Sequence, residues 1–237
     1  MAQKLVVAWP LYRTVPVQWL FNWVKMEREH GANIAAVVGT EAVYLPMAMH
    51  ELINQAFIEC PDFDRLVVME HDMLPPHDAF ERIAQYGPEH DIVGTMYFKH
   101  DYPYHSMVWL QVQPPRYSPL TAEIVKTMVD TPALYEVDAV AMGFTSISRR
   151  VFEGWNPDVP MWDPILPLVG HDLHFCNEAK KPQHGLNKDE AYRVWVDSGI
   201  GSGHLTLVPI GYGHSQAALA ESQPPRWTED GEPRGER

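Results

Sequence analysis

Cysteine is scarce in this sequence: Cys60 and Cys176 are the only two among 237 residues. Two cysteines so far apart do not predict a disulfide framework, and we therefore expect a reducing, cytoplasmic compartment. Long apolar runs are also missing, since none approaches the roughly 20 residues that a membrane span requires. The N-terminal stretch MAQKLVVAWPLYRT has no small-residue cleavage site, so it predicts a first β-strand and not a signal peptide.

Positive charge is in short supply as well. The chain has 18 Lys and Arg residues against 31 Asp and Glu residues, which gives a formal net charge of −13. A nucleic-acid backbone or an anionic membrane needs a basic surface, so neither is expected as the main partner. The deficit does not exclude a small phosphorylated ligand, because clustered carboxylates can hold divalent cations that supply the positive charge.

The sequence does have a regular alternation of strand and helix signals over its first hundred residues. Apolar runs typical of buried strands lie at Leu5–Trp9, Ile34–Val38, Leu66–Met69 and Asp91–Tyr97. Such alternation predicts an α/β fold of one domain, with a mainly parallel central sheet and helices on both faces. In open sheets of this kind, ligands bind outside the carboxyl ends of the strands.

Helices are predicted between these strands. The first lies between Pro16 and Gly31, and four of its residues follow the i, i+3, i+4, i+7 pattern: Val17, Leu20, Phe21 and Val24. A second amphipathic helix covers Met49–Phe57. Asp78 and Glu81 resemble a capping box at the start of a third.

The second half of the chain is less regular. Residues 100–132 predict loops and short elements, and Val137–Ile147 is apolar with Gly143 inside. Asp172–Ala179 predicts a helix and Tyr192–Val196 a strand. We expect one domain over residues 1–220 and a disordered polar tail, rich in Pro and Gly, over 221–237.

One strand ends in an unusual group of side chains. In LVVMEHDMLPP, four apolar residues run directly into Glu70, His71 and Asp72. Carboxylates at the carboxyl end of a buried strand lie where a binding crevice is expected, although strand-end solvation and capping of the next turn explain the same pattern.

Three segments, taken in order, resemble a known family. After the acidic strand end come VDAVAMGFTSISRRVFE (residues 137–153), GHDLHFCNEAKK (170–181) and YRVWVDSGIGSGHL (192–205). This order is similar to that of GT-A-fold glycosyltransferases of the family 2 type. In that family a D-x-D motif ends a central strand, and a Gly-containing strand and an Arg-rich helix start follow. A G-E-D-type motif then opens a helix, and a late strand leads to a G-H motif.

The resemblance implies a Rossmann-like GT-A fold, a nucleotide-diphosphate sugar as donor (a UDP-sugar above all), and Mn²⁺ or Mg²⁺. It also implies an acceptor of unknown kind: a glycan, a protein or a small molecule. Glu70, His71 and Asp72 stand at the D-x-D position and are implied in donor binding, with Asp72 and Glu70 as metal ligands. His204 is implied as a further metal ligand and Asp172 as the general base of an inverting reaction.

The resemblance places the nucleotide on the loop after the first strand, at Pro10, Arg13 and Thr14. Two departures stand out. His171 replaces the acidic residue of G-E-D, and MAMHEL stands where an Arg-Asn pair often begins the second helix.

Other interpretations stay open at this point. A GT-A-like nucleotidyltransferase would use the same metal chemistry, but WPLYRTVPVQ lacks the Gly-rich basic loop. An inactive binding module would explain the departures. His171 and His174 could form a zinc pair. Trp155 and Trp162 could stack on an acceptor sugar or anchor loops.

Overall fold

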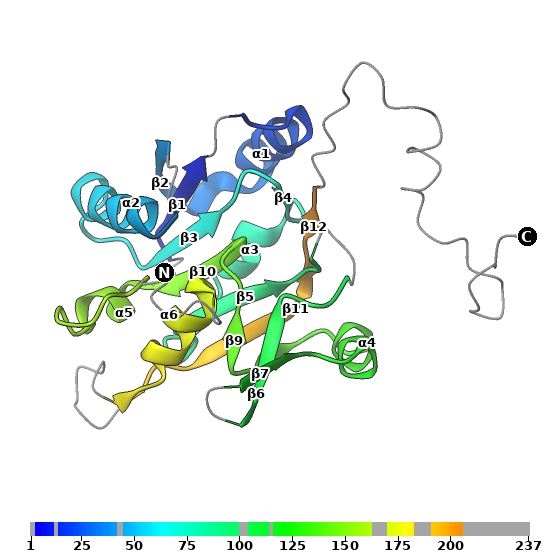
Figure 1. Cartoon of the computed structure of the whole chain (residues 1–237). Coiled ribbons are helices and arrows are strands. Elements are labelled where there is room, and N and C mark those ends of the chain that lie inside the picture. Colours follow the sequence, from blue (N-terminus) through cyan, green and yellow to red (C-terminus); the bar gives the residue numbers. More distant parts are fainter. Residues whose placement is uncertain are drawn as a thin grey trace, which may run out of the picture. The chain divides into compact units, whose positions relative to one another are not determined.

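The computed structural model describes residues 3–11, 14–41, 45–99, 104–113, 116–162, 170–182 and 191–205. Its central sheet is built from β1 (Leu5–Leu11), β2 (Ile34–Glu41), β3 (Arg65–Met69), β5 (Ile92–Met96), β8 (Leu134–Glu136), β10 (Phe144–Ser148) and β11 (Val194–Gly201). The seven strands lie in the order β2-β1-β3-β10-β5-β11-β8. Figure 1 labels all of them except β8.

The sheet is mainly parallel, as predicted. Strand β1 pairs in parallel with β2 and β3, and β5 pairs in parallel with β11. Strand β10 is antiparallel to both β3 and β5, so these two neighbours run the same way. Only β10 and β8 among the seven run against the others. The carboxyl ends of β1, β3, β5 and β11 therefore share one edge.

Helices cover both faces of the sheet: α1 (Val17–His30), α2 (Leu45–Glu59), α3 (Ala79–Ile83), α5 (Arg149–Glu153) and α6 (His171–Ala179). Alternate residues of a strand point to opposite faces. Val6 and Val68 accordingly pack with α2, α5 and α6, while Val7 and Val67 pack with α1 and α3. Strands β3 and β5 are buried on both sides, which explains their continuous apolar runs, whereas the edge strand β2 exposes alternate residues.

Two small sheets extend this core. Strand β12 (Gly203–His204) pairs with β4 (Met73–Leu74). Strands β7 (Arg116–Pro119), β6 (Val108–Gln113) and β9 (Ala139–Val140) form the other sheet, and α4 (Ala122–Asp130) follows β7. The region expected to contain loops and short elements thus holds two short strands and a helix capped by Thr121.

Helix α1 has the expected bounds but the opposite orientation. Its buried residues are Trp19, Trp23 and Met26. The apolar stripe singled out in the sequence is exposed instead: Val17 62%, Leu20 50%, Phe21 70% and Val24 41%. The helix is apolar on two sides, and the larger tryptophans occupy the core because they bury more apolar surface.

The capping box is also absent, because Asp78 makes no side-chain cap hydrogen bond in α3. None of the described helices is long and apolar enough to cross a membrane. Arg13, the domain end at residue 220 and the tail over 221–237 lie outside the described residues.

Candidate functional site

The tip of β3 is held from two sides. Every residue of β3 is buried, and Glu70, His71 and Asp72 form the turn between β3 and β4. The backbone N–H of Glu70 donates to the carbonyl of Gly143 at 2.8 Å. The indole N–H of Trp19 donates to the carbonyl of Glu70, also at 2.8 Å. Helix α1 and the turn before β10 therefore fix the backbone position of Glu70 at the start of this turn.

Gly143 is required at this place by close packing. Its backbone N–H donates to the buried hydroxyl of Tyr97 at 3.0 Å. A Cβ on Gly143 would lie 2.6 Å from that hydroxyl and 2.9 Å from the sulfur of Met73. Any side chain would push these groups apart and, through the hydrogen bond to Glu70, shift the site.

Asp72 and His204 meet although they are far apart in sequence. Pairing of β12 with β4 brings Nε2 of His204 to 3.3 Å from Oδ2 of Asp72. The backbone N–H of Leu205 donates to the carbonyl of Asp72 at 2.7 Å, which joins the end of β12 to the turn before β4. The other carboxylate oxygen of Asp72, Oδ1, is buried and has no hydrogen-bond partner among the described residues.

The ring of His204 is oriented by a backbone carbonyl. Its Nδ1 lies 2.9 Å from the carbonyl oxygen of Phe98, which can only accept a hydrogen bond, so Nδ1 carries a proton. Burial lowers the pKa of His204, but the hydrogen bonds to Asp72 and Phe98 outweigh burial and raise the pKa. Burial raises the pKa of Asp72, and His204 and His71 reverse this effect and lower the pKa.

Glu70 lies in an environment that disfavours its charge. Burial, followed by the negative charges of Asp172 and Asp72, raises the pKa of Glu70 to about 8. The imidazoles of His171 and His204 lower this pKa but do not compensate. Three carboxyl groups therefore share one region that contains few positive charges. A bound cation would offset the repulsion between these carboxyl groups.

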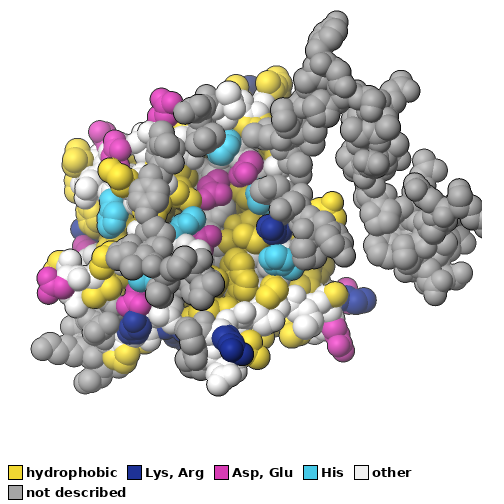
Figure 2. Space-filling view, viewed as in Figure 1, with side chains coloured by type: hydrophobic (Ala, Val, Ile, Leu, Met, Phe, Trp, Pro, Cys, Tyr) yellow, Lys and Arg dark blue, Asp and Glu magenta, His cyan; other side chains and the backbone are white. Residues whose placement is uncertain are grey.

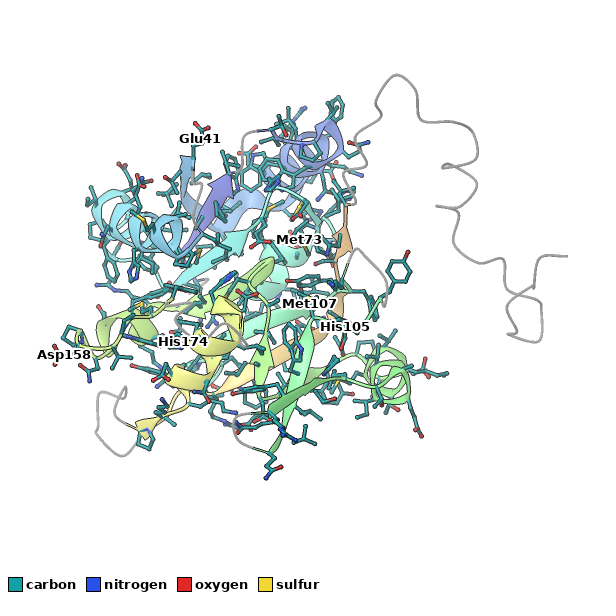
Figure 3. All side chains as sticks on the ribbon, in the orientation of Figure 1. Glu41, Met73, His105, Met107, Asp158 and His174 are labelled. Carbon is teal, nitrogen blue, oxygen red and sulfur yellow. The ribbon has the colours of Figure 1, made fainter. Side chains whose placement is uncertain are left out.

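The third carboxylate comes from α6. Gly170 is the N-cap of this helix, and His171 and Asp172 form its first turn. Nε2 of His171 lies 2.7 Å from Oδ1 of Asp172, within ion-pair distance. The two atoms are buried but are not aligned as a hydrogen bond, and neither has another hydrogen-bond partner among the described residues. Met73 and His174, labelled in Figure 3, mark β4 and α6, the two elements involved.

Among the residues singled out in the sequence, Asp72, Asp172 and His204 all act on Glu70 through charge. Acidic and histidine side chains gather near the centre of the face shown in Figure 2, beside apolar side chains. Pro10 is buried in β1, two residues beyond Ala8, which pairs with Val68 of β3. Thr14 is exposed before α1.

A cation would have a limited set of protein ligands here. Within the described ranges, no group of three or more His, Cys, Asp or Glu residues gathers as a complete metal cage. The ligand pair that is present consists of Asp72 and His204, with the unpartnered Oδ1 of Asp72 beside it. Magnesium and manganese at phosphate sites commonly use one or two protein carboxylates, with substrate phosphates and water completing the shell. The residues fit such a cation.

Two alternatives from the sequence are not supported. His171 contacts Asp172, whereas Nε2 of His174 contacts the carbonyl of Pro160 at 3.1 Å, so the two histidines do not form a pair. Trp155 and Trp162 are buried and stack on Phe175, at 5.2 and 4.6 Å between ring centroids. The two tryptophans are core anchors and are not presented to a sugar.

Sequence reasoning missed the residues that support the site. Tyr97 and Trp19 hold Gly143 and Glu70 through hydrogen bonds. The predicted strand ended at Tyr97, but nothing in its pattern points to a partner 46 residues away. The buried position of Trp19 was not predicted, because a different stripe of apolar residues on α1 also matched the helical period.

No protein-family model matches this chain, and no curated protein matches it in sequence. Among solved structures, it is similar to A197 from STIV, with a TM-score of 0.57 and 17% identity over 86% of each chain. That likeness shows a shared fold. A glycosyltransferase involved in the glycosylation of the major capsid of PBCV-1 aligns at a TM-score of 0.36 and 9% identity, over 63% of this chain and 62% of that one. This second likeness is too low to support an argument.

Proposed function

We propose that this protein is a metal-dependent glycosyltransferase that moves a sugar from a nucleotide-diphosphate sugar to an acceptor hydroxyl. One observation carries the proposal. The carboxylates of Glu70, Asp72 and Asp172 gather with His171 and His204 at the carboxyl edge of a mainly parallel sheet. This edge is where ligands bind in open α/β sheets.

The charge of the site accounts for the metal requirement. A diphosphate would be repelled by Asp72 and Asp172 unless a cation lay between them. The raised pKa of Glu70 shows that one more negative charge is already unfavourable here. Asp72 and His204 would hold the cation, and the single imidazole favours manganese over magnesium. When bound, the cation would stabilise the charge that develops on the leaving diphosphate.

The order of the motifs supports a sugar donor. The resemblance predicts an acidic turn after a central strand, an Arg-rich helix start, a G-E-D-type helix start and a G-H segment. In the structure these are the turn after β3, the start of α5 at Arg149, the start of α6 at Gly170, and β12. Three of these four segments contribute side chains to the site, which weak isolated motifs would not do.

The nucleotide is proposed to rest at the end of β1. Pro10 lies two residues beyond the pair of Ala8 and Val68, toward the carboxyl ends of β1 and β3, and Thr14 follows before α1. A UDP-sugar is the donor we expect, and a cytoplasmic location suits such a donor. The acceptor is not identified by any contact of the described residues.

The test is donor turnover by the Asp72→Asn variant. Using UDP-glucose, UDP-galactose, UDP-N-acetylglucosamine and GDP-mannose with Mn²⁺, release of the nucleoside diphosphate would be followed for wild type and variant. We expect a loss of about 10²-fold or more in the variant. Asp78→Asn, an exposed residue a few positions along the chain, is the matched control and should keep wild-type turnover.

Retained turnover in a folded Asp72→Asn protein would contradict the proposal. Pyrophosphate release from a nucleoside triphosphate would point instead to nucleotidyl transfer on the same metal site.

A further inference from the structure

The histidine that replaces an acidic residue in G-E-D lies against the neighbouring aspartate. Nε2 of His171 is 2.7 Å from Oδ1 of Asp172, in the first turn of α6. We propose, on the basis of the function proposed above, that His171 is the general base of the transfer and that Asp172 is its positioning residue. The resemblance assigned the general base to Asp172, whereas here the general base is its neighbour His171.

The geometry separates the two ends of the imidazole. Nε2 is buried against Asp172. Nδ1 has no hydrogen-bond partner among the described residues, and the side chain keeps 27% of its surface exposed. The carboxylate of Asp172 is less exposed, at 19%. The imidazole therefore has a nitrogen without a partner among the described residues, and it is the more exposed of the two groups.

The charges around the ring suit a base. Burial lowers the pKa of His171, but contact with Asp172 and the charge of Glu70 outweigh burial and raise the pKa. The described titratable groups that act on the ring are therefore Asp172, on its own helix, and Glu70, from the turn after β3. A base whose pKa lies near the working pH is the most effective proton acceptor. Glu70, with a pKa of about 8, holds its proton below that pH, so its charge acts on the ring only as the pH approaches 8.

The proposed transfer forms one bond to the anomeric carbon and breaks another. The acceptor oxygen forms a bond to the anomeric carbon while its proton passes to Nδ1 of His171. The bond between the anomeric carbon and the β-phosphate oxygen breaks, and its electron pair leaves on the nucleoside diphosphate. Oδ1 of Asp172, 2.7 Å from Nε2, stabilises by its negative charge the imidazolium that forms. The proton returns to solvent after the product departs.

Kinetics of two variants and one control test this assignment. The donor that wild type turns over fastest would be used with Mn²⁺, with water as acceptor. His171→Gln should lower kcat by about 10²- to 10⁴-fold with a small change in KM, and should remove the acidic limb of the kcat against pH profile. His171→Glu should restore part of the rate with the limb moved to lower pH. His174→Gln, one turn along α6, should behave as wild type.

A readout independent of turnover accompanies the kinetics. The imidazole resonances of His171 would be titrated by NMR in wild type and Asp172→Asn. The pKa should be raised in wild type and fall in the variant. A His171→Gln protein that keeps kcat within about threefold, or keeps the acidic limb, would overturn the assignment while leaving the proposed function intact. Absence of turnover of every donor by wild type would overturn the proposed function, and this assignment with it.

Discussion

His204 has an acceptor on each side of its ring. Its Nδ1 proton is committed to the carbonyl of Phe98, so a neutral imidazole would turn its lone pair on Nε2 toward the carboxylate of Asp72. Two Lewis bases 3.3 Å apart require either a proton or a cation between them. Binding of a metal ion must therefore release a proton, and affinity should rise with pH.

Glu70 makes the folded protein less stable as pH rises. An acid whose folded pKa is raised to about 8 binds more protons when folded than when unfolded. The free energy of unfolding should therefore fall between about pH 4.5 and pH 8, the interval between the ordinary and the raised pKa. Glu70→Gln removes this effect. We expect the variant to be more stable than wild type by about 4 kcal/mol at pH 8 and by less than about 1 kcal/mol at pH 5.

Urea unfolding followed by tryptophan fluorescence at several pH values would measure this difference. Glu59→Gln, at an exposed position at the end of α2, is the control and should track wild type at every pH. Parallel profiles for Glu70→Gln and wild type would show that Glu70 is not buried among like charges. A gain in stability with a loss of turnover would mark Glu70 as a residue kept for function.

Single residues of the site were predictable where a strand end or a motif marked them. Glu70 and Asp72 follow an apolar run, and Asp172 and His204 occupy motif positions. The contact between His171 and Asp172 was not predictable, because it depends on side-chain orientation in one helical turn. The pairing of Tyr97 with Gly143 depends on a tertiary approach that no local pattern encodes.

Helix α1 joins the site to the core through its inner side. Trp19 is 2% exposed and donates to the carbonyl of Glu70, while Phe21, two residues on, is 70% exposed. Trp19→Ala should therefore lower the free energy of unfolding by about 3–5 kcal/mol. Phe21→Ala should change it by no more than about 0.5 kcal/mol, as for other surface positions.

Chemical denaturation of the two variants measures both effects side by side. The sequence pattern alone predicts the reverse order, since Phe21 belongs to the i, i+3, i+4, i+7 stripe. Equal losses, or a larger loss for Phe21→Ala, would mean that α1 packs with its other side inward.

Helices and strands were predicted well where the hydrophobic periodicity agrees with the Pro and Gly residues that mark element ends. The strands β1, β2, β3 and β5 were found within a few residues, and α1 ends before Gly31 as expected. The orientation of α1 was wrong because both of its sides are apolar, and period alone does not choose between them. Helix α4 was missed because it lies in a stretch dominated by Pro and aromatic residues.

Topology explains how distant segments form one site. The shared carboxyl edge of the parallel strands brings together residues from different elements. These are residues 70–72, 97, 143, 171–172 and 204. The fold class followed from the alternation of strands and helices. The antiparallel strand β10 did not, although its position between β3 and β5 places Gly143 beside Glu70.

Calorimetric titration of UDP, GDP, CDP and ADP, each with and without Mn²⁺, would show whether this edge is a metal-dependent nucleotide site. We expect one diphosphate to bind only with the metal, to bind more tightly at pH 8 than at pH 6, and to lose its binding in Asp72→Asn while Asp78→Asn binds normally. No binding of any diphosphate to the folded wild-type protein, or binding that needs neither the metal nor Asp72, would contradict the account.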